Sequence, residues 1–322
     1  MSIFQTGKPL NKFTKIVPIF FTINSSYASY AATSIKSLTE KTDPKRYYRI
    51  IILHDGINLI NRFRLRRLVT KNCAIQFKKI TRSVYLRVII RSCARRKGAG
   101  DFFSSAVYYY RAFIPRLFPQ YEKAVYIDSD TILRGDIGEL FDLDLKDKAM
   151  AAMVDPKVET IPEFRDYVNN AVGVPYNEYV NSGVLVMNLK KLRKMGYLKT
   201  MIELVERTDE NLVAPDQDYL NVILRGNIKF LNPIWNAEPQ EKLPRGTKLV
   251  HFNLCNKPWH YKNVPGEKLF WDAAKKTSFY KDLKRQQANF TTKEQKKEAD
   301  KIAALIKKAA KLAKTKKPLI EL

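Results

Sequence analysis

Short apolar runs alternate with longer segments of mixed apolar and polar residues along the first part of the chain. Apolar runs bounded by turn residues are typical of buried strands, and apolar residues at three- and four-residue spacing are typical of helices. The pattern predicts strands at 16–23, 47–56 and 73–80, with helices at 27–42 and 58–71 between them. This alternation predicts an α/β fold in which helices flank a mostly parallel, Rossmann-like central sheet.

The alternation continues less regularly downstream. A basic stretch at 81–101 ends in Gly98-Ala99-Gly100 and is either a loop or a helix at the edge of a cleft. The other predicted elements are a helix at 105–121, strands at 123–130 and 148–156, a strand-to-helix segment at 181–194, a helix at 216–224 and a strand at 248–260 that leads into a Pro-Trp turn. Because such sheets bind ligands at the carboxyl ends of their strands, we expect the functional site there.

After about residue 281 the chain becomes rich in alanine and lysine. Thr291 and Glu294 match a capping box, which predicts the start of a helix. Lysines surround one apolar helical face, formed by Ile302, Leu305, Ile306, Ala309 and Leu312. This basic amphipathic helix is docked on the body of the protein, lies on an anionic membrane surface, or binds nucleic acid. The chain is thus divided into a main domain at 1–280 and a basic helical tail at 281–322.

The chain is strongly basic, with 58 Lys and Arg against 32 Asp and Glu, a net charge of +26 and a pI near 9.8. Such a charge predicts an anionic partner: nucleic acid, anionic lipid or a phosphate-bearing ligand. A nucleic-acid-binding protein should interleave basic and aromatic residues on one face or contain a known module, and the sequence shows neither. Nucleic acid is therefore not the expected partner, but a basic protein that binds an anionic surface without catalysis stays an alternative.

The number and spacing of the cysteines indicate whether the protein resides in a reducing or an oxidising cellular compartment. Cys73, Cys93 and Cys255 form no CxxC motif, which predicts neither a disulfide framework nor a zinc site and favours a reducing, cytoplasmic location. The basic tail adds the alternative of peripheral attachment to the inner face of the cell membrane. No apolar run approaches the roughly 20 residues of a membrane span. The lysines that precede the run at 16–23 imitate a signal peptide, but the helix predicted directly after it favours a first strand.

The segment AVYIDSDTILRGD at 124–136 is the strongest candidate for chemistry. Its apolar run ends in Asp128-Ser129-Asp130-Thr131, and two carboxylates at the tip of a buried strand need positive partners. A haloacid dehalogenase-type phosphatase would use Asp128 as its nucleophile, but that motif should open its domain, and here about 110 residues of strand and helix precede it. Alternatively, both aspartates hold a divalent metal that carries a nucleotide diphosphate. Thr131 is then an ordinary residue past the strand tip.

A second predicted strand supports the metal site. It carries His251, one of only three histidines, and Lys257 and Trp259 follow soon after it. An imidazole nitrogen is a suitable third ligand for Mn²⁺, and a lysine can neutralise a diphosphate leaving group. The presence of His251 and Lys257 together with the two aspartates therefore favours a metal-dependent transferase over a phosphatase.

Five segments match, in order, the motifs of one enzyme family across about residues 16–262: FFTINSSYASYAATSIKSL, YYYRAFIPRLFPQYEKAVYIDSDTILRGDIGELFDLDL, YVNSGVLVMNLKKLR, PDQDYLNVIL and HFNLCNKPWH. In these segments the chain resembles family 8 of the retaining glycosyltransferases. The resemblance implies a GT-A fold, a UDP-sugar donor (UDP-glucose or UDP-galactose), Mn²⁺ or Mg²⁺, and transfer of a hexose with retention of anomeric configuration. It also implies a glycan, lipid-linked or glycoprotein acceptor in cell-surface polysaccharide biosynthesis, as in lipopolysaccharide galactosyl- and glucosyltransferases.

The resemblance further implies that 1–280 is a catalytic domain, with a nucleotide-binding half at about 1–130 and an acceptor half at about 131–265. It also implies roles for individual residues. The metal ligands would be Asp128, Asp130 and His251. Arg111 would reach the donor, and Lys257 would bind its diphosphate. The donor-sugar and acceptor pocket would contain Asn181 and the catalytic candidates Asp155, Asp216 and Gln217. The remaining donor-binding residues, near the uracil, the ribose and the metal, would be Thr22, Ile23, Asn24, Tyr27 and Ser129.

Two positions depart from the family pattern. Asn24-Ser25-Ser26 stands where the family often has Asp-Asp-Asn, so a contact with the base would lack charge. Leu254 stands where the family usually has glycine, so either a backbone hydrogen bond to phosphate is absent or the loop runs differently. No carboxylate of these motifs is an obvious nucleophile, and Gln217 is a poor one. The pattern therefore favours front-side attack by the acceptor hydroxyl over double displacement.

Overall fold

The computed structural model describes residues 15–81, 83–95, 105–208, 212–314 and 317–322. Its strands are β1 (Lys15–Ile23), β2 (Arg46–His54), β3 (Cys73–Lys79), β4 (Lys123–Ile127), β5 (Thr131–Leu133), β6 (Met150–Ala152), β7 (Val184–Asn188), β8 (Ile228–Phe230) and β9 (Leu249–His251). Its α-helices are α1 (Ala28–Thr39), α2 (Leu59–Arg66), α3 (Val84–Arg95), α4 (Ile114–Leu117), α5 (Ile137–Asp142), α6 (Pro156–Thr160), α7 (Pro162–Tyr167), α8 (Leu189–Lys194), α9 (Tyr197–Arg207), α10 (Pro215–Ile223), α11 (Glu267–Ala274), α12 (Tyr280–Asn289) and α13 (Thr292–Leu312). Short 3₁₀ or π turns lie at Ser25–Tyr27, Ala106–Phe113, Val168–Val172, Pro233–Trp235 and Leu319–Glu321.

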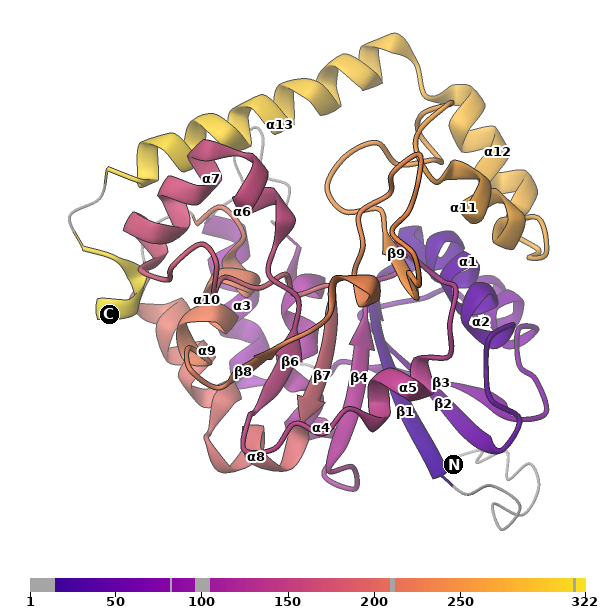
Figure 1. The fold of residues 1–322 in the computed structure, drawn as a ribbon, viewed down its shortest axis with the longest axis horizontal. Coiled ribbons are helices and arrows are strands. Elements are labelled where there is room, and N and C mark those ends of the chain that lie inside the picture. The colour runs from indigo at the N-terminus through magenta and orange to yellow at the C-terminus, as the bar shows by residue number, and fades with distance from the viewer. Residues whose placement is uncertain (1–14, 82, 96–104, 209–211, 315–316) are drawn as a thin grey trace.

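A seven-stranded sheet runs through the molecule in the order β3-β2-β1-β4-β7-β6-β8 (Figure 1). Neighbouring strands are parallel except where β7 pairs with β4 and β6. Helices cover both faces, and the central strands are apolar throughout because neither face meets water. The predicted α/β fold with a mostly parallel central sheet and flanking helices is confirmed.

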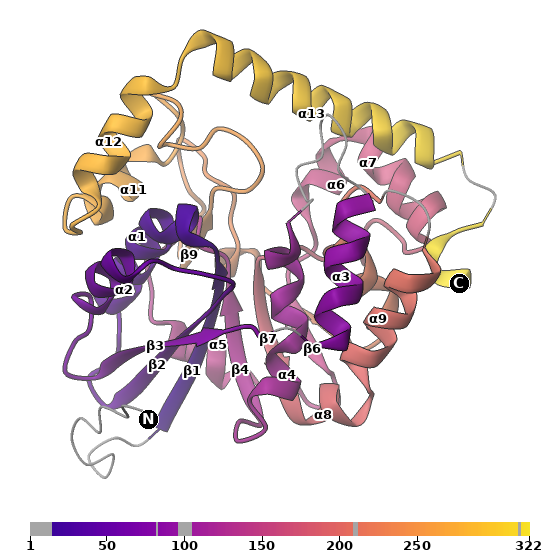
Figure 2. The same ribbon diagram turned by 180° about the vertical axis from the view of Figure 1, so that it is seen from behind.

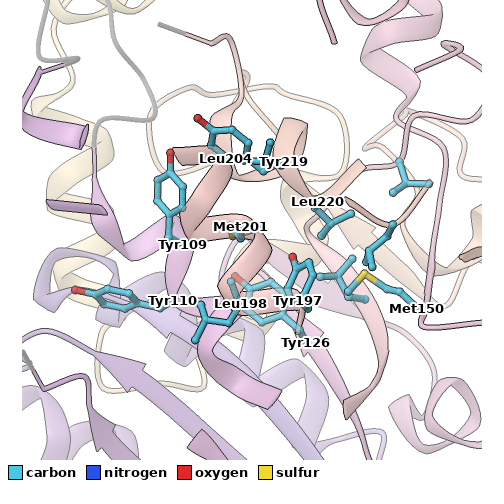
Figure 3. Packing of buried hydrophobic residues seen from close by; sticks show 14 of the residues in the cluster. Tyr109, Tyr110, Tyr126, Met150, Tyr197, Leu198, Met201, Leu204, Tyr219 and Leu220 are labelled. Carbon is cyan, nitrogen blue, oxygen red and sulfur yellow. The ribbon is translucent and has the colours of Figure 1, made fainter. Parts of the chain in front are cut away.

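Buried side chains form an apolar core on each face of this sheet. Successive side chains of β1 point to opposite faces of the sheet and so enter the two cores in turn. Phe20 packs in the first core, and Ile19 and Phe21 pack in the second. The first core lies against α3, α4, α9 and α10, and Figure 3 shows Tyr126 of β4 and Met150 of β6 among the tyrosines and leucines of α9 and α10. The second core contains α1, α5, α11 and the strands β5 and β9.

The helix predicted at 105–121 is instead a 3₁₀ helix at Ala106–Phe113 followed by the short helix α4. Pro115 contributes to the break between the two helices, because it has no N–H to donate to the carbonyl of Arg111 one helical turn before it. The N–H of Ile114 donates to that carbonyl, which is the hydrogen-bond pattern of a 3₁₀ helix. The basic stretch predicted at 81–101 contains α3, and its residues 82 and 96–101 lie outside the described residues.

A separate two-stranded sheet joins distant parts of the sequence. β5 and β9 pair antiparallel, with Thr131 opposite His251. The N–H of Phe252 donates to the carbonyl of Asp130 at 2.9 Å, which extends the pairing by one residue. Thr131 is therefore more than an ordinary residue past the strand tip, since it sets the register and its hydroxyl lies 2.9 Å from that of Ser34 in α1.

Helix α13 crosses one end of the molecule, from α12 to α6 and α7 (Figures 1 and 2). The predicted capping box is present, because Thr291 Oγ1 accepts the N–H of Glu294 while the Glu294 carboxylate accepts that of Thr291. Leu305 and Ala309 are buried in the first core, so the apolar face of the helix is docked on the body. A role of its lysines at a membrane stays a prediction. Among the described residues, no helix is both long enough and apolar enough to cross a bilayer.

Candidate active site

Two carboxylates and an imidazole converge at the carboxyl end of β4. Ligand atoms of Asp128, Asp130 and His251 all lie within 4.8 Å of one another. The β5–β9 pairing causes this convergence, because it places His251 opposite the residue that follows Asp130. Carboxylate oxygens and an imidazole nitrogen suit a divalent cation such as Mn²⁺. The residues therefore fit the metal site that the sequence predicts.

A chain of hydrogen bonds, here called the relay, determines which nitrogen of His251 faces the carboxylates. Asn181 Nδ2 donates to Asp155 Oδ2 at 3.0 Å, and Asn236 Nδ2 donates to Asn181 Oδ1 at 3.0 Å. Asn236 Oδ1 remains as an acceptor 2.9 Å from His251 Nδ1, so that nitrogen carries the hydrogen. His251 Nε2, 3.1 Å from Asp130 Oδ1, then keeps its lone pair for a cation.

Gly183, directly before β7, leaves room for this arrangement. A Cβ at this position would lie 2.3 Å from His251 Cε1 and 2.9 Å from Asp128 Oδ2, which are distances that real Cβ atoms do not show. Its carbonyl accepts the N–H of Asp128 at 2.8 Å, and its own N–H donates to Asn181 Oδ1 at 2.9 Å. The backbone of Gly183 therefore touches both the metal ligands and the relay, and a residue with a side chain would push them apart.

Two cationic side chains compensate the charge of the aspartates. Lys257 Nζ lies 2.6 Å from Asp130 Oδ2, and the buried guanidinium of Arg111 lies 3.5 Å from Asp128 Oδ1. Burial alone would raise the pKa of Asp130, but the positive charge of Lys257 opposes burial, and that pKa lies well below its usual range. Asp130 is therefore ionised at neutral pH, as a metal ligand must be.

Asp216, in the first turn of α10, has a buried carboxylate oxygen that accepts no hydrogen bond from the described residues. This Oδ2 lies 3.1 Å from Arg111 Nε, but the Nε–H donates to the carbonyl of Tyr108 instead. Burial raises the pKa of Asp216 to about 7, although Arg111 opposes the shift. A buried carboxyl with an unused oxygen gains most from a hydroxyl ligand, because leaving the oxygen unpaired is costly.

Gln217 connects two parts of the site and does not present a free amide. Its Nε2 donates to Asp155 Oδ2 at 2.9 Å, and its Oε1 accepts from Ser182 N at 2.9 Å and from Ser182 Oγ at 3.1 Å. Asp155 is equally engaged, because its Oδ1 accepts the N–H of Lys157 and its Oδ2 accepts from Gln217 and Asn181. Neither side chain is free to act as a nucleophile.

Two adjoining pockets meet at the metal ligands. The β7-side pocket has a polar floor that includes Arg111, Asp128, Asp155, Asn181, Asp216 and Gln217. The β1-side pocket is lined by residues that include Thr22, Asn24, Tyr27, Tyr30, Ser129, Asp130, Lys257 and Trp259. Both pockets share Tyr108, Asp128, Asn253 and Leu254, so the structure brings nearly all the predicted site residues into one continuous cleft.

Two of the predicted donor-binding residues differ from expectation in detail. The side chain of Ile23 is fully buried in the second core, so only its backbone can face a ligand. Asn24 Oδ1 accepts from the N–H and hydroxyl of Ser26 and from the N–H of Tyr27, which caps the turn at Ser25–Tyr27. Its Nδ2 is left as the group that can meet a base.

Leu254 adopts the left-handed backbone conformation that favours glycine, with φ of +62°. A leucine in this conformation costs roughly 1–2 kcal/mol. Its side chain lines both pockets and packs against the first core. The loop after β9 therefore has a glycine-like backbone at this position, and the leucine adds an apolar wall where the pockets meet.

The sequence model of glycosyl transferase family 8 matches residues 18–263, which contain all the predicted site residues. The chain belongs to this family. Membership confirms the predicted retaining hexosyltransferase and excludes both the phosphatase and a binding protein without catalysis. Enzymes of this kind use a divalent metal, a nucleotide-sugar donor and a glycan acceptor.

Relatives and solved structures agree with this assignment. A putative glycosyltransferase of Haemophilus influenzae is 28% identical over 255 residues, which are 76% of this chain and 73% of that protein. The lipopolysaccharide 1,2-glucosyltransferase of Escherichia coli is 27% identical over 195 residues, 55% of this chain and 56% of its own length.

The galactosyltransferase LgtC, solved with donor and acceptor sugar analogues, has a TM-score of 0.68 at 24% identity, covering 81% of this chain and 96% of LgtC. The bifunctional glycosyltransferase WbbM has a TM-score of 0.70 at 24% identity over 88% of this chain, which spans only 53% of WbbM. Both structures share the predicted GT-A fold.

Three residues that position the family 8 site are absent from the sequence-based prediction. Tyr126 donates its hydroxyl to Asp128 Oδ1 at 2.5 Å, and two-residue periodicity along β4 could have placed both side chains on one face. Gly183 lies inside a matched segment, where a glycine before a strand signals close approach. Asn236 follows the turn at Pro233–Trp235 and carries no signal in the sequence.

Asn236→Leu removes the acceptor that orients His251 and keeps a similar volume. We expect affinity for Mn²⁺ to fall about 10- to 100-fold, as is usual when a residue that orients a metal ligand is lost. Calorimetric titration with Mn²⁺ measures this. The matched control is Asn232→Ala, which removes only the cap on Ile234 and should bind like the wild type. Equal affinities of the two variants would contradict the relay.

The raised pKa of Asp216 predicts a pH-dependent difference in stability. In the folded protein this carboxyl releases its proton at about pH 7, compared with 3.8 for an ordinary aspartate. Because the folded state binds the proton more tightly, the contribution of this group to the free energy of unfolding falls as pH rises across that range. Asp216→Asn mimics the protonated form, so its stability relative to the wild type should rise by on the order of 2–3 kcal/mol between pH 5 and pH 8. Urea unfolding at both pH values measures the difference, and parallel behaviour of the two proteins would contradict the buried, titrating carboxyl.

Proposed function

We propose that this family 8 enzyme transfers glucose or galactose from a UDP-sugar to a glycan or lipid-linked acceptor, with Mn²⁺ as its metal. One observation carries the proposal: two carboxylates, an imidazole and two cationic side chains meet where two pockets join. A sugar nucleotide has its diphosphate in the middle and a different group at each end, which matches this layout. The glucosyltransferase from Escherichia coli and the galactosyltransferase LgtC support the choice of a hexose, and the former supports a cell-surface glycan as acceptor.

The β1-side pocket has the features of a nucleoside site. Tyr27 is 39% exposed at its rim and offers a base a face on which to stack. Behind it, the ring of Tyr30 stacks on that of Trp259, with centroids 4.1 Å apart, which gives the pocket a rigid aromatic wall. The amide Nδ2 of Asn24 supplies an uncharged donor for a carbonyl edge of uracil. These groups support UDP as the nucleotide.

The diphosphate is the leaving group, and the side chains around it prepare its departure. A divalent cation held by the two aspartates and His251 would neutralise its charge. Lys257 adds a fixed positive charge beside Asp130, in a partly buried site where electrostatic interactions are stronger than in water. Arg111 lies between Asp128 and Asp216, so it links the metal ligands to the polar floor of the β7-side pocket.

Retention of configuration fits front-side attack, in which the acceptor hydroxyl approaches on the side of the departing diphosphate and gives its proton to it. The hydrogen bonds of Asp155 and Gln217 support this mechanism, because they leave neither residue free to bond to the sugar. Asp216, with its unused oxygen, binds a hydroxyl of the donor sugar. A covalent sugar trapped on any of these side chains would contradict the proposal.

The β7-side pocket also offers space for the acceptor, and α13 forms part of its wall. Its apolar lining comprises Val158, Phe164, Val168, Val213, Leu254 and Leu305. Apolar and aromatic side chains suit the C–H faces of a sugar ring. Leu305 comes from α13, outside the residues that the family model matches, so this part of the acceptor site belongs to the tail.

A cytoplasmic location is part of the proposal. Cys73, Cys93 and Cys255 are not joined by disulfides, which favours a reducing compartment. The nucleotide sugar would then reach the enzyme from the cytoplasmic pool.

The proposal predicts activity that depends on both the metal and the nucleotide. With UDP-, GDP- and ADP-sugars, the protein should release nucleotide only from a UDP-sugar and only with Mn²⁺, and EDTA should abolish the reaction until Mn²⁺ is restored. Asp130→Asn should lower turnover about a hundredfold or more, because it removes a charged ligand at the site where negative charge develops.

Asp144→Asn is the matched control, because Asp144 is exposed and lies outside the cleft. Its turnover should equal that of the wild type. Full activity of Asp130→Asn, or activity that survives EDTA, would contradict the metal role.

Leu305→Ala enlarges the β7-side pocket from the α13 side. We expect the KM for an acceptor sugar to rise about tenfold through the lost apolar contact, while hydrolysis of the donor without acceptor stays unchanged. Transfer to a panel of mono- and disaccharides, compared with hydrolysis, measures this. Leu312→Ala, a half-buried leucine of the same helix outside the pocket, is the control for loss of stability. If both variants change transfer and hydrolysis alike, α13 plays no part in acceptor binding.

A further inference from the structure

Helix α2 has a second apolar face that the fold does not use. Leu65 and Leu68 are buried and attach the helix segment to the second core. On the opposite side of the helix, Leu59, Ile60 and Phe63 are 80%, 71% and 64% exposed. A surface helix needs one apolar face to pack on its protein. The outward face, which no described residue covers, calls for a partner.

The surroundings of this face are strongly positive. Residues 56–100 contain thirteen arginines and lysines and no aspartate or glutamate. Arg66 and Arg67, at the end of α2, are exposed beside the apolar face, and Lys78 and Lys79 are exposed on the neighbouring strand β3. The outward apolar residues of α2 together with Arg66 and Arg67 are called the α2 surface below.

The helix is held firmly, so this surface is part of the fold. Arg64 forms an ion pair with Asp282 of α12 at 2.6 Å, and its guanidinium lies 3.7 Å from the centroid of the Phe279 ring. Asn58 caps the first turn, because its Oδ1 accepts the N–H of Asn61 at 2.7 Å. Protein contacts therefore fix α2 while its outer face stays exposed.

The side of α2 that carries Asn58 and Asn61, opposite the α2 surface, is joined to the β1-side pocket. Asn58 Nδ2 donates to Ser25 Oγ at 3.2 Å, and Asn61 Nδ2 donates to the carbonyl of Ser25 at 3.3 Å. Ser25 belongs to the same turn as Ser26 and Tyr27, which line that pocket. The α2 surface is therefore the outer side of a helix whose other side contacts the rim of the pocket.

We infer that the α2 surface docks on an anionic lipid membrane. Leu59, Ile60 and Phe63 would enter the region between the head groups and acyl chains, and Arg66 and Arg67 would contact lipid phosphates. The bilayer interface supplies both kinds of partner side by side. A nucleic acid would satisfy the arginines but leave three large apolar side chains without contact. The apolar face of α13, in contrast, packs on the first core, where Leu305 and Ala309 are buried and Ile306 and Leu312 are partly buried.

Sedimentation with lipid vesicles tests the inference, which goes beyond the proposed reaction and does not depend on it. The protein should bind vesicles of equal parts phosphatidylglycerol and phosphatidylcholine, and not vesicles of phosphatidylcholine alone. The triple variant Leu59→Ser/Ile60→Ser/Phe63→Ser should bind about tenfold more weakly or worse, since apolar burial supplies part of the affinity. Arg66→Gln/Arg67→Gln should lose about tenfold or more, because each cation near an anionic surface contributes roughly fivefold.

Two controls separate the α2 surface from general stickiness and from the tail. Phe230→Ser removes an apolar side chain that is 51% exposed on β8, at the other edge of the sheet, and should bind like the wild type. Lys307→Gln/Lys311→Gln removes exposed charge from α13 and should change binding much less than the α2 variants. All variants should hydrolyse a soluble UDP-sugar at the wild-type rate, so failure of the membrane inference is distinguishable from failure of the proposed function.

Several results would overturn the inference: unchanged vesicle binding of both α2 variants, or a loss confined to the α13 variant. If the triple variant abolished self-association in size-exclusion chromatography and left vesicle binding intact, the α2 surface would be a protein interface. Should the triple variant not fold, Phe63→Trp provides the same test. Its emission should shift to the blue with anionic vesicles and be quenched by brominated lipid, and a spectrum without these changes would equally overturn the inference.

Discussion

Two carboxylates at the end of an apolar strand must be compensated by positive charge, and the rest of the site depends on how this is done. Asp128 and Asp130 are costly where they stand unless cations face them. The fold brings this charge from separate segments, Arg111 from the 3₁₀ helix before β4 and Lys257 from the loop after β9, while β9 itself supplies His251. The short β5–β9 pairing holds these segments together, so a minor sheet fixes the geometry of the active site.

The same hydrogen bonds serve the metal ligands and the substrate pocket. Asp155 Oδ2 accepts from Asn181, which begins the relay to His251, and from Gln217, which braces the pocket through Ser182. A shift of Gln217 would therefore be felt at the metal ligands. This coupling gives a physical reason for the two amides of the β7-side pocket, Asn181 and Gln217, to be hydrogen-bonded within the protein, because such groups hold their neighbours in place without taking part in bond formation.

The parts of this account that sequence could predict are those with a strong local signal. Strands β1, β2 and β4 are mostly apolar on both faces, so their positions follow from composition, and the spacing in the Asp-x-Asp segment indicates two of the proposed metal ligands. Contacts set by tertiary structure could not be predicted. Asn236 orients His251 across fifteen residues, and the helix predicted at 105–121 is divided near Pro115 into a 3₁₀ helix and a short α-helix. Periodicity also predicts a helix near α2, but only the fold shows that Leu59, Ile60 and Phe63 face outward.

The central claim is that Asp128, Asp130 and His251 hold one divalent cation because the backbone at Gly183 lets them approach. Titration of Mn²⁺, followed by the electron paramagnetic resonance signal of the free ion, tests this claim with two matched glycine variants. Gly183→Ala, whose Cβ would lie 2.3 Å from His251 Cε1, should bind Mn²⁺ at least about tenfold more weakly than the wild type. Gly56→Ala, where no atom lies within 4 Å of the new Cβ, should bind one ion with wild-type affinity. Wild-type affinity in Gly183→Ala would contradict the claim.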